Sequence, residues 1–308
     1  MKDETLGPYK TILIAGPTAG GKSGLALALA QKYQGVIINT DSMQVYSALR
    51  IVTARPSEID EALAPHRLYG HVDGHEAYST GAWLRSVQAL VPQLRDEFLT
   101  LIFVGGTGLY FNALTLGLSE IPAIPVTLRQ NLRDELKADG SYALYVHLLV
   151  EDPASAAQLK ATDGQRIIRA LEVLRHTGRS LRAWQSDSVT PLIDLDACST
   201  KAIVINPDRE VLRQKIAERF KVMVAAGALK EIQHLIDQKL DPQVPVMKAI
   251  GVKELGAYLA GSITLDSAID LAVIASRQYA KRQRTWFAGQ MDARWLRVAD
   301  VATAYHHI

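Results

Sequence analysis

Eight consecutive residues near the beginning of the chain have the types and spacing of a phosphate-binding loop. They follow the apolar, strand-like run Thr11–Ala15 and fit the pattern G-x-x-x-x-G-K-[ST]. In such a loop, successive backbone N–H groups point at phosphate oxygens, and the dipole of the following helix adds positive potential. The lysine bridges phosphates and the serine holds Mg²⁺. The loop consists of Gly16, Pro17, Thr18, Ala19, Gly20, Gly21, Lys22 and Ser23.

Polar residues follow two further strand-like runs. Val36–Asn39 leads to Asp41, and Thr100–Val104 leads to a glycine-rich segment that contains Thr107. Apolar strands of this kind belong to a parallel sheet that is buried on both faces. Ligands of such sheets bind beyond the carboxyl ends of the strands. We therefore expect the loop, Asp41 and Thr107 to surround one crevice.

Asp41 is the side chain on which the chemistry depends. An NTPase needs a strand-end acid that reaches the metal, but the clearest strand, Leu101–Val104, ends in Gly-Gly-Thr-Gly without a carboxylate. This argues against ordinary ATP or GTP hydrolysis. Asp41 can act as a general base beside the phosphates, or it can cap a helix that begins near Ser42. The residues alone leave both interpretations open.

The order of the expected elements predicts an α/β fold with an insertion. Strand signals fade after Ile121, a mostly helical pattern runs to Gln185, and a core strand returns at Ala202–Ile205. Tyr145–Val150 fits a strand or a helix equally well. We predict a P-loop NTPase-like core, with a parallel sheet flanked by helices, from residues 1–121 and 196–308. Residues 122–195 are predicted to form an inserted all-helical domain.

Composition limits the cellular setting and the partners. The chain has 308 residues, of which 48% are hydrophobic, and one cysteine, Cys198, so neither an internal disulfide nor a cysteine-based metal site is expected. Neither a signal peptide nor a membrane-spanning run is apparent, so we expect a cytoplasmic protein. The net charge of +2 does not by itself indicate a nucleic-acid partner.

Basic residues nevertheless gather in two regions. Five arginines stand between residues 166 and 182, and further cations stand at helical spacing in the predicted helix Leu265–Phe287. A third helix, Val211–Ala226, is amphipathic and carries Arg219 among its cations. Such residues can form a solvated face, or they can neutralise a polyanion larger than a diphosphate. The charge pattern alone leaves both alternatives open.

Eight stretches give the chain a resemblance to the tRNA dimethylallyltransferases, also called tRNA isopentenyltransferases, the bacterial IPP transferase family. They cover most of the chain in order: residues 16–23, Asp41–Tyr46, Thr53–Pro56, Pro65–Leu68, Gly105–Phe111, Gln165–Val173, Arg219–Phe220 and Tyr279–Trp286. The resemblance implies transfer of a dimethylallyl group from dimethylallyl diphosphate to N6 of an adenine. The target is adenine 37, immediately 3′ of the anticodon, in tRNAs that read codons beginning with U.

The resemblance also implies roles for the loop and its neighbours. The loop then holds the diphosphate of the prenyl donor rather than ATP, and Asp41 accepts the proton from adenine N6. Thr18, Lys22 and Arg219 stabilise the departing diphosphate, where charge accumulates in the transition state. Ser23 is the expected ligand of Mg²⁺, the one cofactor. The protein is expected to work as a monomer.

Because a stacked base does not expose its N6, the resemblance implies that the adenine is flipped out of the anticodon loop. The anticodon stem-loop is the expected RNA partner. Residues expected to contact it are Asp41, Ser42, Met43, Gln44, Thr107, Arg129, Gln165, Arg166, Ile167, Ile168, Arg169, Lys248, Lys253, Arg277, Lys281, Arg282 and Gln283.

The chain departs from the family pattern at a few positions. Val52 replaces a usual Gly, Arg55 a usual Lys, and Val252 a usual Tyr. Three other functions share parts of the pattern: an adenylate isopentenyltransferase that acts on free AMP, a small-molecule kinase that uses ATP, and a non-catalytic RNA-binding ATPase. The first would lack the helical insertion, and the kinase would not need the arginine-rich segment.

Overall fold

The computed structural model describes residues 9–187 and 189–308, which form two compact units. Unit 1 consists of the chain up to Thr115 together with Leu192–Ile308, and unit 2 is Leu116–Pro191. The sequence-based boundaries lay a few residues further along, at 121 and 195. Each unit has its own core and is described by itself.

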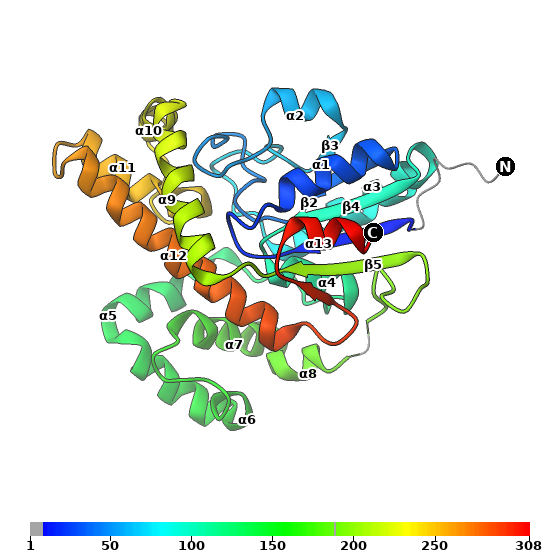
Figure 1. The fold of residues 1–308 in the computed structure, drawn as a ribbon. Coiled ribbons are helices and arrows are strands. Elements are labelled where there is room, and N and C mark those ends of the chain that lie inside the picture. The colour runs from blue at the N-terminus through cyan, green and yellow to red at the C-terminus, as the bar shows by residue number, and fades with distance from the viewer. Residues whose placement is uncertain (1–8, 188) are drawn as a thin grey trace. The chain divides into compact units, whose positions relative to one another are not determined.

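Unit 1 is built on a six-stranded sheet with the strand order β3-β2-β4-β1-β5-β6, and all of its strand pairs are parallel. Helices α1 and α13 cover one face of this sheet and α3 and α4 the other (Figure 1). The predicted α/β fold is therefore confirmed. The strands are β1 (Thr11–Ala15), β2 (Gly35–Asn39), β3 (His66–Arg67), β4 (Thr100–Gly105), β5 (Thr200–Ile205) and β6 (Leu296–Val298).

Most helices of unit 1 bury apolar side chains, whereas the short α2 (Glu58–Leu63) has no buried residue. Helix α9 packs Leu212, Ile216, Phe220 and Met223 inward, as its periodicity predicted. The unit contains α1 (Lys22–Lys32), α2 (Glu58–Leu63), α3 (Thr80–Glu97), α4 (Gly108–Thr115), α9 (Arg209–Ala225), α10 (Ala228–Asp237), a 3₁₀ turn at Pro245–Lys248, α11 (Val252–Leu259), α12 (Leu265–Gln290) and α13 (Val301–His306).

Aromatic side chains in the core hold the carboxyl end of β2. Trp83 of α3 is fully buried and stacks on Tyr110 of α4, with ring centroids 4.1 Å apart. Its indole N–H donates to the carbonyl oxygen of Asn39, the last residue of β2, at 2.9 Å. Burial of these large rings therefore fixes the strand end from which Asp41 follows.

The regular elements that the structure describes in unit 2 are all helices, joined by short turns and loops, as predicted. Its elements are α5 (Val126–Glu151), α6 (Pro153–Ala156), α7 (Gly164–Thr177) and α8 (Leu181–Gln185). Tyr145–Val150, which the sequence left open, lies in α5. Gly140 interrupts α5 with a φ of 80°, so the helix is kinked at this glycine. Across the described part of both units, none of the helices has the length and apolarity that a membrane span requires.

The ends of two neighbouring strands approach so closely that residue 105 must be glycine, and a larger side chain there should destabilise the fold. A Cβ on Gly105 would lie 2.2 Å from the backbone of Thr40, because β2 and β4 end side by side. Gly105→Ala should therefore lower the free energy of unfolding by about 2–3 kcal/mol, measured by urea denaturation.

The matched control is Gly289→Ala near the end of α12, where a Cβ would meet nothing within 4 Å. This change should be neutral or stabilise by roughly 0.5–1 kcal/mol, since alanine favours a helix. Equal stability of the two variants would contradict the clash at Gly105.

Candidate functional site

The phosphate-binding loop joins β1 to α1 in a conformation that requires glycine at two positions. A Cβ on Gly16 would lie 2.5 Å from the carbonyl oxygen of Ile205 in the neighbouring strand β5. Gly21 has a φ of 84° and forms the N-cap of α1. Gly21 is required by its own backbone conformation, whereas Gly16 is required by the close approach of β5, a distant strand that the motif does not include.

The loop lines a cavity of about 360 Å³ in unit 1, within the usual size range of small-ligand sites. Strands β1, β2 and β4 all contribute through their carboxyl ends, so the predicted convergence of strand ends is observed. The cavity is lined by Thr18, Ala19, Gly20, Gly21, Lys22, Ser23, Gly24, Asp41, Gln44, Thr53, Ala54, Tyr69, Val104, Gly105, Lys215, Arg219 and Gln283.

Lys22 is held inside the loop. Its ammonium donates a hydrogen bond to the carbonyl oxygen of Pro17 at 2.7 Å. Burial lowers the pKa of Lys22 to about 8, a shift that Asp41 opposes and Arg219 reinforces. An anion bound in the cavity would favour the protonated form of Lys22, so the ammonium group can pair with a negatively charged ligand.

Arg219 reaches the same cavity from α9. Its guanidinium donates to the hydroxyl oxygen of Thr18 in the loop. Burial lowers the pKa of Arg219, and the nearby Asp41 carboxylate opposes this shift. The loop thus has two cations from distant parts of the chain, and each of them donates to a neutral oxygen of the loop.

Gln283 of α12 ties the loop to the end of β4. Its Oε1 accepts from the backbone N–H of Thr18 at 2.8 Å, and its Nε2 donates to the carbonyl oxygen of Gly106 at 2.9 Å. The side chain is 5% exposed. The sequence placed Gln283 among the RNA contacts, whereas the structure uses both polar atoms of its amide to join two segments of the site.

Asp41 closes a turn beside the loop. Its Oδ1 accepts from the backbone N–H groups of Met43 at 2.9 Å and Gln44 at 3.4 Å. The side chain of Asn39 accepts from the Asp41 N–H and donates to its carbonyl oxygen. The capped element is a turn, which corrects the expectation of a helix near Ser42. Within the described residues, Oδ2 accepts no hydrogen bond, so this oxygen is available to a ligand.

Thr107 links the ends of β2 and β4. Its hydroxyl oxygen accepts from the backbone N–H of Ser42 at 2.9 Å, and its own N–H donates to the carbonyl oxygen of Thr40 at 3.1 Å. These two bonds keep the Asp41 turn against the glycine-rich segment after β4. Thr107 does not itself line the cavity, and it supports the site through Thr40 and Ser42, the two neighbours of Asp41.

Several residues that line the cavity have no role assigned from the sequence, among them Thr53, Ala54, Tyr69 and Lys215. Burial raises the pKa of Tyr69, so its hydroxyl stays protonated. The sequence leaves open whether Lys215 belongs to a solvated face or faces a ligand. It precedes Arg219 by four residues on α9, and this spacing puts both on one side of the helix. The spacing is the signal that could have found Lys215.

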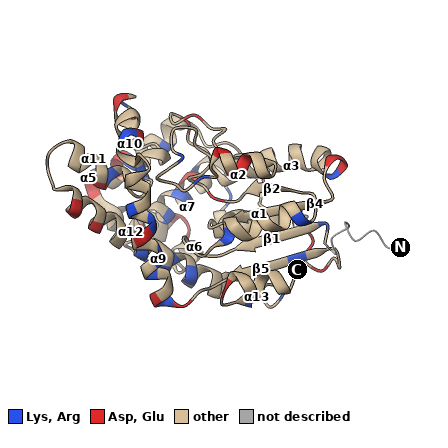
Figure 2. Ribbon diagram, turned by 45° about the horizontal axis from the view of Figure 1, so that its top comes forward, with Lys and Arg blue, Asp and Glu red and all other residues tan. Residues whose placement is uncertain are grey.

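The cations of α12 remain on the surface of unit 1. Arg277, Lys281 and Arg282 are exposed, as are Lys248 and Lys253. Lys281 and Arg282 line a shallow hollow of about 680 Å³ along α12. Figure 2 shows Lys and Arg positions along α9 and α12. These cations have the exposure that contact with a polyanion requires.

In unit 2, some of the residues predicted to contact RNA are exposed and others are buried. Ile167 and Ile168 lie in the core, at 0% and 4% exposure, because they are on the inward face of α7. This burial corrects the expectation that their side chains contact RNA. Gln165 and Arg166, by contrast, are exposed.

Two other arginines of this unit flank a buried carboxylate. Glu172 is 5% exposed and lies 3.4 Å from Arg129 and 3.5 Å from Arg169. The predicted basic cluster is also partly neutralised, since Arg175 pairs with Glu151 and Arg179 pairs with Asp187.

Comparisons with known proteins agree with this geometry. The family described as IPP transferase matches residues 44–290, and the family described as isopentenyl transferase matches residues 9–72. A tRNA dimethylallyltransferase of Rhizobium johnstonii is 51% identical over 296 residues, 96% of this chain and 99% of the relative. One of Mesorhizobium japonicum is 53% identical over 289 residues, 93% and 88% of the two chains.

Solved structures give the same result. The tRNA isopentenylpyrophosphate transferase of Bacillus halodurans is 31% identical, with a TM-score of 0.67, over 97% of this chain and 93% of that one. A eukaryotic dimethylallyltransferase acting on tRNA is 28% identical, with a TM-score of 0.79, over 96% and 75%.

The pKa of Lys22 predicts a pH dependence of diphosphate binding. A bound anion raises this pKa, so the complex holds more protons than the free protein above pH ~8, and binding weakens as the pH rises. The Kd for inorganic diphosphate should increase about 10-fold between pH ~7 and pH ~9 from this group alone, measured by calorimetry.

The control for this measurement is Lys22→Arg, whose guanidinium keeps its proton over the whole range. Titration of the diphosphate itself affects both proteins equally, so the difference between them reports Lys22. Identical pH profiles would contradict a titrating Lys22.

Lys215 should contribute to the same binding step. Lys215→Ala should raise the Kd for inorganic diphosphate about 5-fold, because an exposed charge contributes up to ~1 kcal/mol. Lys221→Ala is the matched control, since Lys221 is an exposed lysine of α9 outside the cavity lining. A similar loss in both variants would show general charge attraction instead.

Proposed function

The chain belongs to the IPP transferase family, and from this membership we propose its reaction: a dimethylallyl group moves from dimethylallyl diphosphate to N6 of adenine 37, immediately 3′ of a tRNA anticodon. The tRNAs are those that read codons beginning with U, and diphosphate is released. One observation carries the proposal. The cations of a phosphate-binding loop and the carboxylate of Asp41 line a single cavity.

The diphosphate of the donor binds in the loop. As the allylic carbon–oxygen bond breaks, negative charge accumulates on the departing diphosphate. Lys22 and Arg219 are already fixed by hydrogen bonds to Pro17 and Thr18, so they need little rearrangement to stabilise this charge. The amino end of α1 adds backbone N–H groups and the positive end of its dipole.

The acceptor amine lies on the other side of the cavity, by Asp41. N6 attacks the allylic carbon and, as the new bond forms, gives up one proton to the carboxylate. Hydrogen bonds from Met43 and Gln44 to Oδ1 fix the orientation of the carboxylate, and they leave Oδ2 for the amine. The turn-closing role and the role as base therefore suit the same side chain.

Magnesium is part of the proposal. The described residues contain no group of three or more His, Cys, Asp or Glu side chains that could hold a metal ion on their own. Mg²⁺ commonly keeps several waters and binds through one or two carboxylates together with substrate phosphates. Ser23 lines the cavity and would supply its hydroxyl oxygen, while the diphosphate of the donor would supply further oxygen ligands. When bound, the ion would neutralise charge on the leaving diphosphate.

The RNA partner is proposed from charge and exposure. The exposed cations of α12 in unit 1 and the exposed Arg166 in unit 2 are suited to the phosphates of an anticodon stem-loop. Arg129 and Arg169, half-buried beside Glu172, are proposed as further contacts of the same RNA. A flipped adenine then brings N6 to the Asp41 side of the cavity. We propose further that the protein works as a monomer in the cytoplasm, a compartment that keeps an exposed thiol such as Cys198 reduced.

The direct test is an incorporation assay. The purified protein is incubated with Mg²⁺, labelled dimethylallyl diphosphate and an anticodon stem-loop that carries adenine at position 37. AMP replaces the RNA in a parallel reaction, and a stem-loop with guanine at position 37 is the matched RNA control. We expect label only in the adenine-containing RNA. Absence of label from it, or equal labelling of AMP, would overturn the proposal.

The role of Asp41 as base is tested by Asp41→Asn. Asparagine retains an Oδ1 that can close the turn, but its amide accepts no proton, so kcat should fall about 100-fold or more. Single-turnover transfer measures this rate, and the melting temperature measures whether the turn is preserved.

Asp41→Ala serves as the comparison, because it removes the turn-closing oxygen as well. We expect both variants to lose transfer and only the alanine variant to lose stability. A near-normal rate in Asp41→Asn would assign Asp41 to turn closure alone.

A further inference from the structure

The carboxylate of Glu231, in helix α10, binds backbone N–H groups of a loop that is distant in the sequence. Its Oε1 accepts from the N–H groups of Arg50 and Ile51 at 2.5 and 2.8 Å, and its Oε2 accepts from the N–H of Val52 at 2.8 Å. About 180 residues of chain separate the partners. Hydrogen bonds to a carboxylate are stronger than those between neutral groups, and here three converge on one side chain.

The loop that Glu231 holds continues into the wall of the cavity. Ala54 has a φ of 54°, in the left-handed region that costs a non-glycine residue free energy. The carbonyl oxygens of Thr53 and Ala54 accept from Nε2 of Gln44 at 2.8 and 3.0 Å. Gln44, Thr53 and Ala54 all line the cavity. Glu231 therefore holds one side of the loop while Gln44 binds the side that faces the site.

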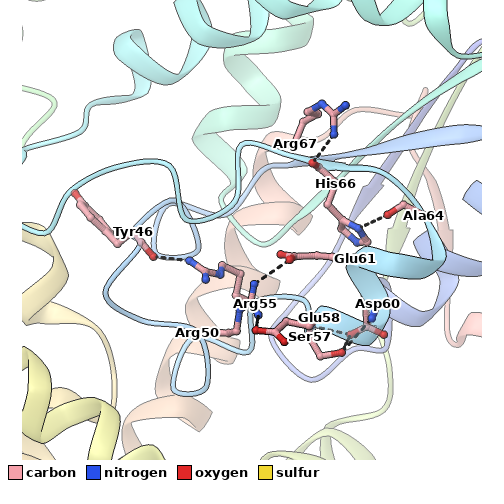
Figure 3. A network of polar contacts seen from close by, with 10 residues as sticks. All are labelled: Tyr46, Arg50, Arg55, Ser57, Glu58, Asp60, Glu61, Ala64, His66 and Arg67. Atoms are coloured by element: carbon pink, nitrogen blue, oxygen red, sulfur yellow. Dashed lines mark hydrogen bonds and ion pairs between the residues drawn. The ribbon is translucent and has the colours of Figure 1, made fainter.

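Other contacts of the loop leave its backbone N–H groups to Glu231. Figure 3 shows the guanidinium of Arg50 paired with Glu58 and Glu61, and that of Arg55 donating to the carbonyl oxygen of Tyr46. The Val52 side chain packs on the beginning of α11, where a Cβ on Gly251 would lie 2.6 Å from it. The side chains thus anchor the loop around its edge, and Glu231 alone satisfies three consecutive N–H groups.

A short chain of hydrogen bonds runs from this loop to the proposed base. Gln44, which binds the two wall carbonyls, also donates its backbone N–H to Oδ1 of Asp41. The diphosphate end of the cavity has separate supports, since Lys22 donates to Pro17 and Arg219 donates to Thr18. Displacement of the wall should therefore affect the acceptor side of the site more than the phosphate side.

We infer that Glu231 is a positioning residue of the transfer site: its carboxylate fixes the Arg50–Val52 turn and so sets the Thr53–Ala54 wall and Gln44 around the acceptor amine. This inference rests on the proposed function for its kinetic consequence. Its structural part, the fixing of the wall, can be measured without any turnover.

Glu231→Gln is the decisive variant because it keeps size and shape. A carboxamide has only one acceptor oxygen, so in either orientation its NH₂ group faces at least one backbone N–H. The N–H group left without an acceptor loosens the turn and lets the wall shift, so kcat/KM for prenyl transfer should fall about 10-fold or more. The Kd for inorganic diphosphate with Mg²⁺ should stay within about 2-fold, since the phosphate side keeps its contacts.

Hydrogen–deuterium exchange supplies the direct readout. The amides of residues 49–55 should exchange faster in Glu231→Gln, while those of β1 and β4 keep their protection. Glu254→Gln is the matched control: Glu254 lies in the first turn of the neighbouring helix α11 and accepts a single backbone N–H, from Gly251 at 2.9 Å, which a carboxamide oxygen can still accept. This control should match the unmodified protein in transfer, diphosphate binding and exchange.

Three results would overturn the inference. They are an unchanged kcat/KM in Glu231→Gln, unchanged exchange of residues 49–55, and a parallel loss of diphosphate binding that would reveal general destabilisation. If the unmodified protein labels no RNA, the proposed function fails. The exchange and binding measurements then still decide whether Glu231 fixes the wall.

Discussion

The arrangement of the site follows from one electrostatic constraint: two cations from distant segments are desolvated around a cavity whose described lining contains a single carboxylate, that of Asp41. Lys22 and Arg219 each donate to an uncharged oxygen, and burial lowers the pKa of both. Fixed cations without paired anions are unfavourable in the empty site and favourable once a diphosphate arrives. Because the desolvation of the two cations is compensated only when an anion binds, the site favours anionic ligands over neutral ones.

Such a site needs a rigid frame, and neutral hydrogen bonds supply most of it. Trp83 holds Asn39, Asn39 holds Asp41, and Gln283 joins the loop to the glycine-rich end of β4. These amide and indole groups position the strand ends without adding charge that would compete with the ligand. Glu231 is the exception, and it turns its carboxylate toward the backbone of a loop rather than toward the cavity.

The sequence predicted those parts of the fold and site that depend on neighbouring residues. The loop, strands β1, β2, β4 and β5 and the inward face of α9 follow local patterns. Strands β3 and β6 have two and three residues, too few for a periodicity to appear. The bonds of Gln283 to Thr18 and of Glu231 to Ile51 span 265 and 180 residues, and no local pattern encodes such pairings. Ile167 and Ile168 are a different case. Their helical spacing already indicates the buried face of a helix, but the resemblance to the family placed them among the RNA contacts.

Two departures from the family pattern gain a physical reason from the same loop. Val52 has no positive φ, so glycine's conformational freedom is not required there, and its side chain fills the space that Gly251 leaves open. Arg55 spreads its guanidinium over Gly70, where a Cβ would lie 1.7 Å from Nη1, and donates to Tyr46. A lysine has no planar group to spread in this way. Both side chains contact the edge of the loop and leave the backbone N–H groups of Arg50, Ile51 and Val52 to Glu231, so the wall of the site is held by the same carboxylate whatever side chains surround it.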